Sequence, residues 1–232
     1  MSQKNEFNQL IGHPVNNWRG VKKPSKQIMQ GNHCVLEIVD IDKHAQQLFD
    51  ALSFENPGDS WTYLKYGSFA NSDEFAVWLK EKKADDDILH YVIKDINSLK
   101  PIGIAGYLDM QPQFGVIEVG FVHFSKLLRK STAATEAMYL MMEYIFDELK
   151  YRRYAWKCDS LNQASRIAAQ RLGFKYEGTL RQCIVYKNRN RDTDYFSILD
   201  SEWPTIKAKF QRWLHGNNFD DQGKQIVSLS KI

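Results

Sequence analysis

A basic loop that follows a strand pattern and precedes a helix pattern carries the clearest chemistry in this chain. The loop is Arg129-Lys130-Ser131-Thr132, in which two cations and two hydroxyl groups lie together. Period-two alternation over Val116–Phe124 predicts the strand, and apolar residues at helical spacing from Thr132 onward predict the helix. The first amides of a helix are unpaired and its dipole favours negative charge, so this turn can bind an anion. We expect a phosphate-bearing cofactor at this position.

A second chemical candidate, Glu118, lies inside the predicted strand. Its carboxyl group interrupts an otherwise apolar strand, where partial burial would raise its pKa towards neutrality. A carboxylate tuned in this way can act as a general base. The alternative is a strand glutamate that forms a structural salt bridge. His123 is a second candidate base: strict alternation puts it on the opposite face from Glu118, although a β-bulge could bring it to the same face.

Composition argues against several other classes of protein. The formal net charge of the 232-residue chain is only +3 and is spread along its length, so a dedicated nucleic-acid binder is not expected. No run approaches the roughly eighteen apolar residues of a membrane span, and the first ten residues lack the apolar segment of a signal peptide. The cysteines, Cys34, Cys158 and Cys183, lie far apart, which is typical of reduced thiols and not of a metal site. We expect a cytoplasmic protein without a bound metal.

The order of predicted elements indicates one mixed α/β (α+β) domain. We expect an irregular N-terminal arm over residues 1–30, attached to the body through Trp18 and Val21, then a single domain over 31–215 and a flexible tail over 216–232. The predicted strands are Val35–Val39, Leu89–Lys94, Ile102–Met110, Val116–Phe124, Arg153–Cys158, Leu180–Lys187 and Tyr195–Leu199. The first predicted helix starts near Asp42 and runs through Leu52, and the others cover Ser72–Lys83, Thr132–Lys150, Gln163–Leu172 and Pro204–Leu214. The two strands joined by the long helix should be parallel, with a right-handed crossover.

Several motifs in the right order resemble the GNAT superfamily, the acetyl-CoA-dependent N-acetyltransferases. Arg129–Ala134 is similar to the family loop Arg/Gln-x-x-Gly-x-Gly/Ala, with Thr132 where glycine is usual. Motif B of the family resembles Asn162-Gln163-Ala164-Ser165, followed by Arg171-Leu172-Gly173-Phe174 and Glu177-Gly178. The resemblance covers about Gly31–Trp203 and fits the branch related to ribosomal-protein-alanine acetyltransferases.

This resemblance implies a GNAT-like fold, a mostly antiparallel mixed sheet in which the two parallel strands splay apart between flanking helices. The pantetheine arm of acetyl-CoA would enter the gap and bond to the backbone of the first strand. The implied cofactor contacts are Phe121, Val122, Arg129, Lys130, Ser131, Thr132, Ala133, Ala134 and Asn162. A β-branched residue resists positive φ, so with Thr132 in the loop either the backbone stays right-handed or the grip on phosphate is weakened.

The resemblance also implies roles in acetyl transfer to an amine. Glu118 would be the general base, backbone amides near Gly120–Val122 would stabilise the oxyanion, and Ser165 would protonate the leaving thiolate. Asn162 and Ser165 could instead only cap the helix that they precede.

The acceptor pocket is less well defined by the sequence. Trp61 and Tyr63, in an aromatic-rich connection, could wall it, or they could simply pack beneath a loop.

The sequence therefore predicts an N-acetyltransferase that works by direct attack in a ternary complex. Its acceptor would be a primary amine, either on a small molecule or at a protein N-terminus. The resemblance also allows a homodimer, because relatives commonly dimerise. Two non-enzymatic alternatives are a CoA-binding module and an RNA or protein interaction module that uses the basic hairpin near Asn188.

Overall fold

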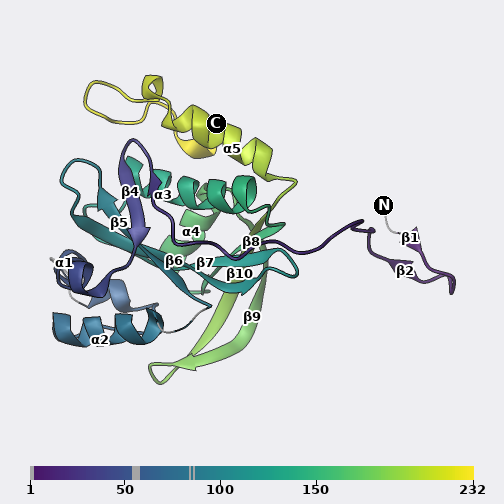
Figure 1. Cartoon of the computed structure of the whole chain (residues 1–232), viewed down its shortest axis with the longest axis horizontal. Helices are drawn as coiled ribbons and strands as arrows, with labels where there is room; N and C mark the ends of the chain where they lie inside the picture. The colour runs from purple at the N-terminus through teal and green to yellow at the C-terminus, as the bar shows by residue number, and fades with distance from the viewer. Residues whose placement is uncertain (1–2, 54–57, 84, 86) are drawn as a thin grey trace.

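The fold is built on one eight-stranded sheet with helices on both faces (Figure 1). The computed structural model describes residues 3–53, 58–83, 85 and 87–232. Strand order in the sheet is β3-β4-β5-β6-β7-β8-β10-β9. The helices α1 (Ile41–Ser53) and α2 (Ser72–Lys83) pack on one face, and the other face holds the helices named below. This is the mixed α/β architecture that the sequence predicts.

The observed elements follow the predicted ones closely. The strands of the sheet are β3 (Met29–Gln30), β4 (Cys34–Ile38), β5 (Leu89–Asp95), β6 (Pro101–Gln111), β7 (Val116–Phe124), β8 (Arg153–Asp159), β9 (Lys175–Tyr186) and β10 (Arg189–Leu199). On the second face lie α3 (Thr132–Glu143), α4 (Gln163–Arg171) and α5 (Trp203–Leu214). A π-helix over Tyr144–Glu148 continues α3, and the closing hairpin of β9 and β10 is longer than predicted.

One pair of neighbouring strands differs from all the others in the sheet. Strands β7 and β8 are parallel because α3 connects them, whereas the other described neighbours are antiparallel. The parallel ladder runs only from Val116 opposite Arg153 to Val119 opposite Trp156. Beyond Val119 and Trp156 the two strands diverge, so the splayed pair is confirmed. Their carboxyl-terminal halves face each other without ladder hydrogen bonds.

Two apolar cores fix the sheet between the helical layers. Met141, Met142 and Ile145 are fully buried between the sheet and α5, where the Tyr107 hydroxyl donates to the Met141 carbonyl at 2.8 Å. Leu48 and Phe75 are buried in the layer of α1 and α2. Each such side chain contributes about 1.5–3 kcal/mol by leaving water, so both faces of the sheet are held firmly.

The N-terminal arm is attached to the body where the sequence predicts. The Trp18 indole donates to the Gln113 carbonyl at 2.7 Å, and the Val21 amide donates to the Pro112 carbonyl at 2.9 Å. A short hairpin of β1 (Gln3–Lys4) and β2 (Leu10–Ile11) extends away from the body (Figure 1). Residues 1–2 of the predicted arm lie outside the described residues.

Two residues of the segment after α5, which was predicted as a flexible tail, are anchored to the body, while its flexibility stays a prediction. The Asn218 side-chain amide donates to the Trp213 and Val227 carbonyls at 3.0 and 3.1 Å, and its Oδ1 accepts from the Val227 amide at 2.9 Å. Leu229 is buried in the main core. The prediction rested on polar composition, which cannot show that one asparagine and one leucine anchor the segment.

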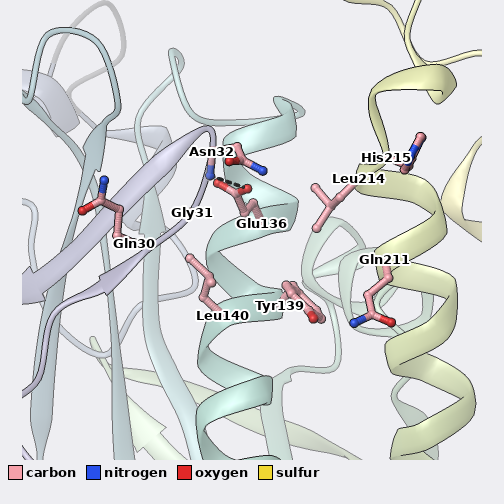
Figure 2. A pocket seen from close by; sticks show the side chains of 9 residues that line it. All are labelled: Gln30, Gly31, Asn32, Glu136, Tyr139, Leu140, Gln211, Leu214 and His215. Carbon is pink, nitrogen blue, oxygen red and sulfur yellow. Dashed lines mark hydrogen bonds between the residues drawn. The ribbon is translucent and has the colours of Figure 1, made fainter.

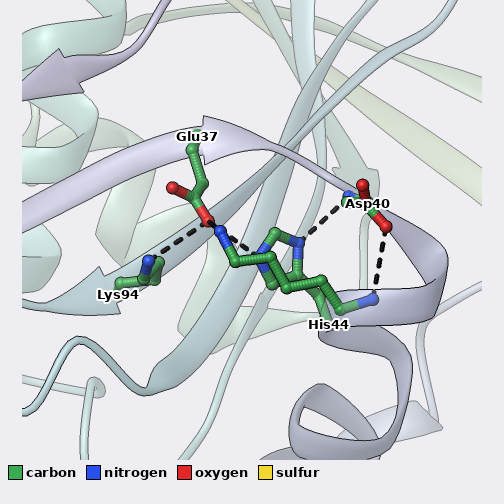
Figure 3. A network of polar contacts seen from close by, with 5 residues as sticks. Glu37, Asp40, His44 and Lys94 are labelled. Atoms are coloured by element: carbon green, nitrogen blue, oxygen red, sulfur yellow. Dashed lines mark hydrogen bonds and ion pairs between the residues drawn. The ribbon is translucent and has the colours of Figure 1, made fainter.

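A partly buried ion-pair network joins α1 to β4 and β5 (Figure 3). Glu37 Oε1 lies 3.1 Å from Lys94 Nζ, 2.8 Å from Lys43 Nζ and 2.7 Å from His44 Nε2. His44 Nδ1 accepts the Asp40 amide proton at 3.0 Å, so a neutral ring carries its own proton on Nε2, facing Glu37. Burial lowers the pKa of His44 below its usual value, which also favours the neutral ring.

We expect Glu37→Gln to destabilise the fold at pH 7 and much less at pH 2.5. Burial alone would raise the Glu37 pKa, but hydrogen bonds from Lys43 and Lys94 outweigh it and lower the pKa from 4.5 to about 2. Stability from a lowered pKa is present above pH 4.5 and is lost as the pH falls towards 2. Urea unfolding should show a loss of about 1–3 kcal/mol at pH 7 that shrinks in acid.

The matched control is Asp87→Asn, which breaks the exposed pair between Lys23 and Asp87. Exposed pairs contribute little, so this variant should follow the parent protein at both pH values. An equal loss at both pH values in Glu37→Gln would contradict the assignment.

Candidate functional site

A β-bulge in β7 reorganises the strand at its unpaired end. Gly120 lies opposite Gly106 and His123 opposite Ile104, so Phe121 and Val122 together oppose Ala105. Phe121 has a φ of 52°. The extra residue reverses the alternation, so that Glu118 and His123 face the same layer of the molecule, as the sequence allowed only if a bulge occurred.

His123 lies inside the aromatic layer of α1 and α2. Its ring centroid is 4.1 Å from that of Trp61, and neither ring nitrogen has a hydrogen-bond partner among the described residues. Burial, helped by the charge of Arg129, lowers the His123 pKa to about 3. The ring is therefore neutral at physiological pH and packs as a structural group.

Trp61 and Tyr63 differ in their surroundings. Trp61 is 2% exposed and packs against Tyr66 and Phe69, whereas Tyr63 is only half-buried. Trp61 therefore packs inside the aromatic layer beneath this connection. A role for Trp61 or Tyr63 in the acceptor pocket stays a prediction.

Glu118 is buried and lies beside two charged side chains. Its Oε2 is 2.6 Å from Lys157 Nζ, and the same ammonium is 2.5 Å from Asp109 Oδ2. Burial raises the Glu118 pKa to about 7; Lys157 opposes this shift and Asp109 adds to it. The two sequence interpretations therefore coexist, because Glu118 is in a salt bridge and also has a pKa suited to a general base.

Asp109 and Lys157 are not among the site residues predicted from the sequence. Asp109 sits in a second bulge, where Leu108 opposes Glu118 and Gln111 opposes Val116, and its φ is 47°. Lys157 follows Trp156, the last residue of β8 that pairs with β7. A lysine within the apolar strand pattern Tyr154–Cys158 is the one signal that could have drawn attention to this position.

The loop before α3 forms a cap for that helix. Ser131 is the N-cap: its Oγ accepts from the Ala134 amide at 3.1 Å and donates to the Leu128 carbonyl at 2.7 Å. The one left-handed residue of this loop is Lys130, with a φ of 61°, and Thr132 begins the right-handed helix. Thr132 therefore needs no positive φ.

The same loop leaves donors free for an anion. Within the described chain, the amides of Lys130, Thr132 and Ala133 have no acceptor in the structure. The exposed Arg129 donates through Nε to the Phe124 carbonyl at 2.9 Å, which holds its guanidinium beside the unpaired end of β7. Such a group of amides and cations fits a pyrophosphate.

Asn162 and Ser165 lie at the start of α4, directly after β8. Asn162 Oδ1 accepts from the Ser165 amide at 3.1 Å, so Asn162 is an N-cap as its residue type suggests. Ser165 Oγ accepts from the Trp156 indole at 2.9 Å. Because this bond uses only a lone pair, the hydroxyl retains a proton that it can donate.

A separate cavity of about 590 Å³ lies between α3, α5 and the turn after β3 (Figure 2). Its lining residues are Gln30, Gly31, Asn32, Glu136, Tyr139, Leu140, Gln211, Leu214 and His215. The Glu136 carboxylate accepts from the amides of Asn32, His33 and Cys34 at 2.9, 2.6 and 3.0 Å. Glu136 is therefore structural, and none of the predicted site residues lines this cavity.

Two kinds of feature are absent from the described residues. No helix there is both long and apolar enough to cross a membrane. In the same part of the chain, no group of three or more His, Cys, Asp or Glu side chains is arranged to hold a metal ion.

Glycine substitutions at Lys130 and Thr132 should have opposite effects on stability. Lys130→Gly removes the cost of a left-handed lysine and should stabilise by about 0.5–1 kcal/mol after the entropy of glycine is counted. Thr132→Gly weakens the first turn of α3 and should destabilise by about 0.3–0.5 kcal/mol. Urea unfolding of both variants measures this; stabilisation by Thr132→Gly would contradict the helical assignment of Thr132.

Comparisons with known proteins agree with this geometry. Residues 36–175 match the family described as "Acetyltransferase (GNAT) domain". The crystal structure of a GCN5-related N-acetyltransferase from Brucella melitensis is 42% identical, covers 93% of this chain and 98% of its own, and gives a TM-score of 0.91.

More distant relatives extend the comparison. The chain is 27% identical to the uncharacterized N-acetyltransferase YnaD of Bacillus subtilis over 143 residues, which cover 61% of this chain and 81% of YnaD. The ribosomal-protein-S5-alanine acetyltransferase of Vibrio fischeri shares the fold, with a TM-score of 0.61 at 16% identity over 76% of this chain and 98% of that one. The matched domain, the splayed strands and the strongly similar Brucella structure together establish that this chain belongs to the GNAT family of acetyltransferases.

Proposed function

We propose that this acetyltransferase moves an acetyl group from acetyl-CoA to a primary amine, with Glu118 as the general base. The observation that carries the proposal is the position of Glu118, a buried carboxyl group with a pKa of about 7 just before the bulge and the open end of β7. A structural salt bridge alone would not need a carboxyl group that titrates near neutrality.

The donor site would lie along the open end of β7 and the loop after it. The free amides of Lys130, Thr132 and Ala133 would hold the pyrophosphate, with Arg129 beside them. Backbone groups of Phe121 and Val122, unpaired on the side of β8, would bond to the pantetheine arm as a neighbouring strand would. When bound, acetyl-CoA supplies an activated acyl group as a thioester.

The reaction itself needs a proton acceptor, an oxyanion donor and a proton donor. Glu118 takes the proton of the ammonium group, directly or through one water, so that the amine nitrogen gains a lone pair and attacks the carbonyl carbon. Backbone amides near Gly120–Val122 stabilise the oxyanion. The carbon–sulfur bond would then break while the attacking nitrogen gives up its second proton to water. The Ser165 hydroxyl would donate a proton to the departing sulfur and regain one from water.

The acceptor would enter from the side of the α1–α2 connection. The tip of the β9–β10 hairpin reaches this connection, where Lys187 Nζ donates to the Trp61 carbonyl at 2.8 Å and an Arg189 nitrogen donates to the Thr62 carbonyl at 2.7 Å. These bonds fix the backbone on both sides of Thr62 and so support Tyr63 as a wall of the pocket. A small amine or a protein N-terminus is the acceptor class that we propose.

Saturating acetyl-CoA should raise the melting temperature of the protein. A ligand at about a hundredfold its Kd adds about 2.7 kcal/mol, and for a domain of this size we expect a rise on the order of 5–10 °C. Arg129→Glu should abolish most of the rise, because it places a negative charge beside the pyrophosphate. The control Arg212→Glu changes an exposed arginine on α5 and should retain the full rise. No rise in the parent protein would rule out the donor site.

Glu118→Gln should retain the acetyl-CoA-dependent rise in melting temperature but lose transfer. We expect kcat to fall by about 10²–10⁴-fold, the usual contribution of a general base. Free thiol release with a panel of primary amines and peptide N-termini measures the rate. Because the base must be ionised, kcat/KM of the parent should fall as the pH drops below about 7. Unchanged activity in Glu118→Gln would assign the base elsewhere.

A further inference from the structure

Three charged side chains from three adjacent strands meet on the face of the sheet that carries α1 and α2. They are Asp109 of β6, Glu118 of β7 and Lys157 of β8, and the lysine ammonium contacts both carboxyl groups at 2.5 and 2.6 Å. Side-chain exposure falls from 53% for Asp109 through 24% for Lys157 to 8% for Glu118. The group therefore extends from solvent to the buried base.

The backbone builds this arrangement in two ways. The bulge at Asp109 places an extra residue opposite Ile117, which turns the aspartate towards Glu118. Lys157 lies one residue beyond the end of the parallel ladder, on the same face as Ala155, the partner of Glu118. The Lys157 ammonium also lies 5.3 Å from the ring centroid of Tyr195, its neighbour on β10.

The two neighbours act on Glu118 in opposite directions. The ammonium of Lys157 favours the carboxylate form through charge and a hydrogen bond. Asp109 favours the protonated form, because its own negative charge repels a second one and because a hydrogen bond between two carboxyl groups requires a shared proton. Burial by itself already favours the protonated form of Glu118, so the lysine opposes the effect of burial and the aspartate adds to it.

We propose that Lys157 and Asp109 are opposed positioning residues that together set the protonation of Glu118, the lysine holding its carboxylate form and the aspartate its protonated form. This inference rests on the proposed role of Glu118 as the base. Neither residue contacts substrate in this assignment; both act through Glu118.

The other titratable groups near this cluster are few. Tyr195 of β10 faces Lys157, and burial raises the pKa of Tyr195. Cys183 of β9 lies near Tyr195. Lys65, in the connection between α1 and α2, acts on Asp109 by its charge. Burial has the largest effect on the Glu118 pKa, and Lys157 and Asp109 are the charged neighbours that act on it.

The opposed roles give an unusual signature. Lys157→Met should raise the titration midpoint of Glu118, and Asp109→Asn should lower it, each by about one pH unit or more. Lys157→Arg keeps the positive charge and should restore most of the parent midpoint. General damage to the structure would move both variants in the same direction, so opposite shifts separate a specific role from misfolding.

The midpoint can be measured without an acceptor amine. We would label the glutamate side chains with ¹³C at the carboxyl carbon and follow the chemical shift from about pH 4 to about pH 9. This interval roughly spans the pKa values of exposed and buried carboxyl groups. The signal that disappears in Glu118→Gln is that of Glu118. The control Lys207→Met removes a lysine that pairs with Asp147 at 2.6 Å and Glu143 at 3.0 Å on the other face, and it should leave the midpoint unchanged.

Opposite shifts in Lys157→Met and Asp109→Asn, with recovery in Lys157→Arg, would support the inference, and the acid limb of kcat/KM should move with the midpoints. Shifts in the same direction, or a midpoint indifferent to both changes, would overturn it. Opposite shifts in a protein that transfers no acetyl group would retain the inference about Glu118 and remove the proposed function. The two failures are therefore distinguishable.

Discussion

The early end of the parallel ladder between β7 and β8 is the constraint on which the rest of the structure depends. Hydrogen bonds join these strands only up to Val119 and Trp156, and beyond these residues each strand has backbone groups without a neighbour on one side. Unpaired donors and acceptors inside a sheet are costly unless another group satisfies them. An extended chain with amide groups, such as the pantetheine arm, has the required chemistry.

The bulge in β7 and the cap of α3 make this opening useful. The bulge inserts one extra residue into β7 just after the ladder ends, and the strand can then bend away from β8. The chain returns through a loop whose single left-handed residue, Lys130, precedes the N-cap Ser131. The open strand and the free amides of the helix are therefore consecutive in sequence, and the proposed anion site directly follows the open strand.

The two bulges also decide which titratable side chains lie together on the face of the sheet that carries α1 and α2. The two bulges bring Asp109 and His123 to the face of Glu118, but with different results. His123 is enclosed by aromatic rings and stays neutral, whereas Glu118 keeps contact with Lys157 and Asp109. Burial thus removes one candidate base and tunes the other, and the difference lies in their neighbours and not in their residue types.

The sequence by itself determined the order of elements, the parallel pair and the position of the loop Arg129–Ala134 before α3, because periodicity and capping are local properties of consecutive residues. The strand Val116–Phe124 and the helix Ser72–Lys83 were predicted to the residue. Only the tertiary structure decided that Asp109 and Lys157 meet at Glu118, that His123 turns to the same face and that Asn218 anchors the segment after α5. Bulges change the facing of every later residue in a strand, and contacts between distant strands depend on register, so neither can be read from local pattern.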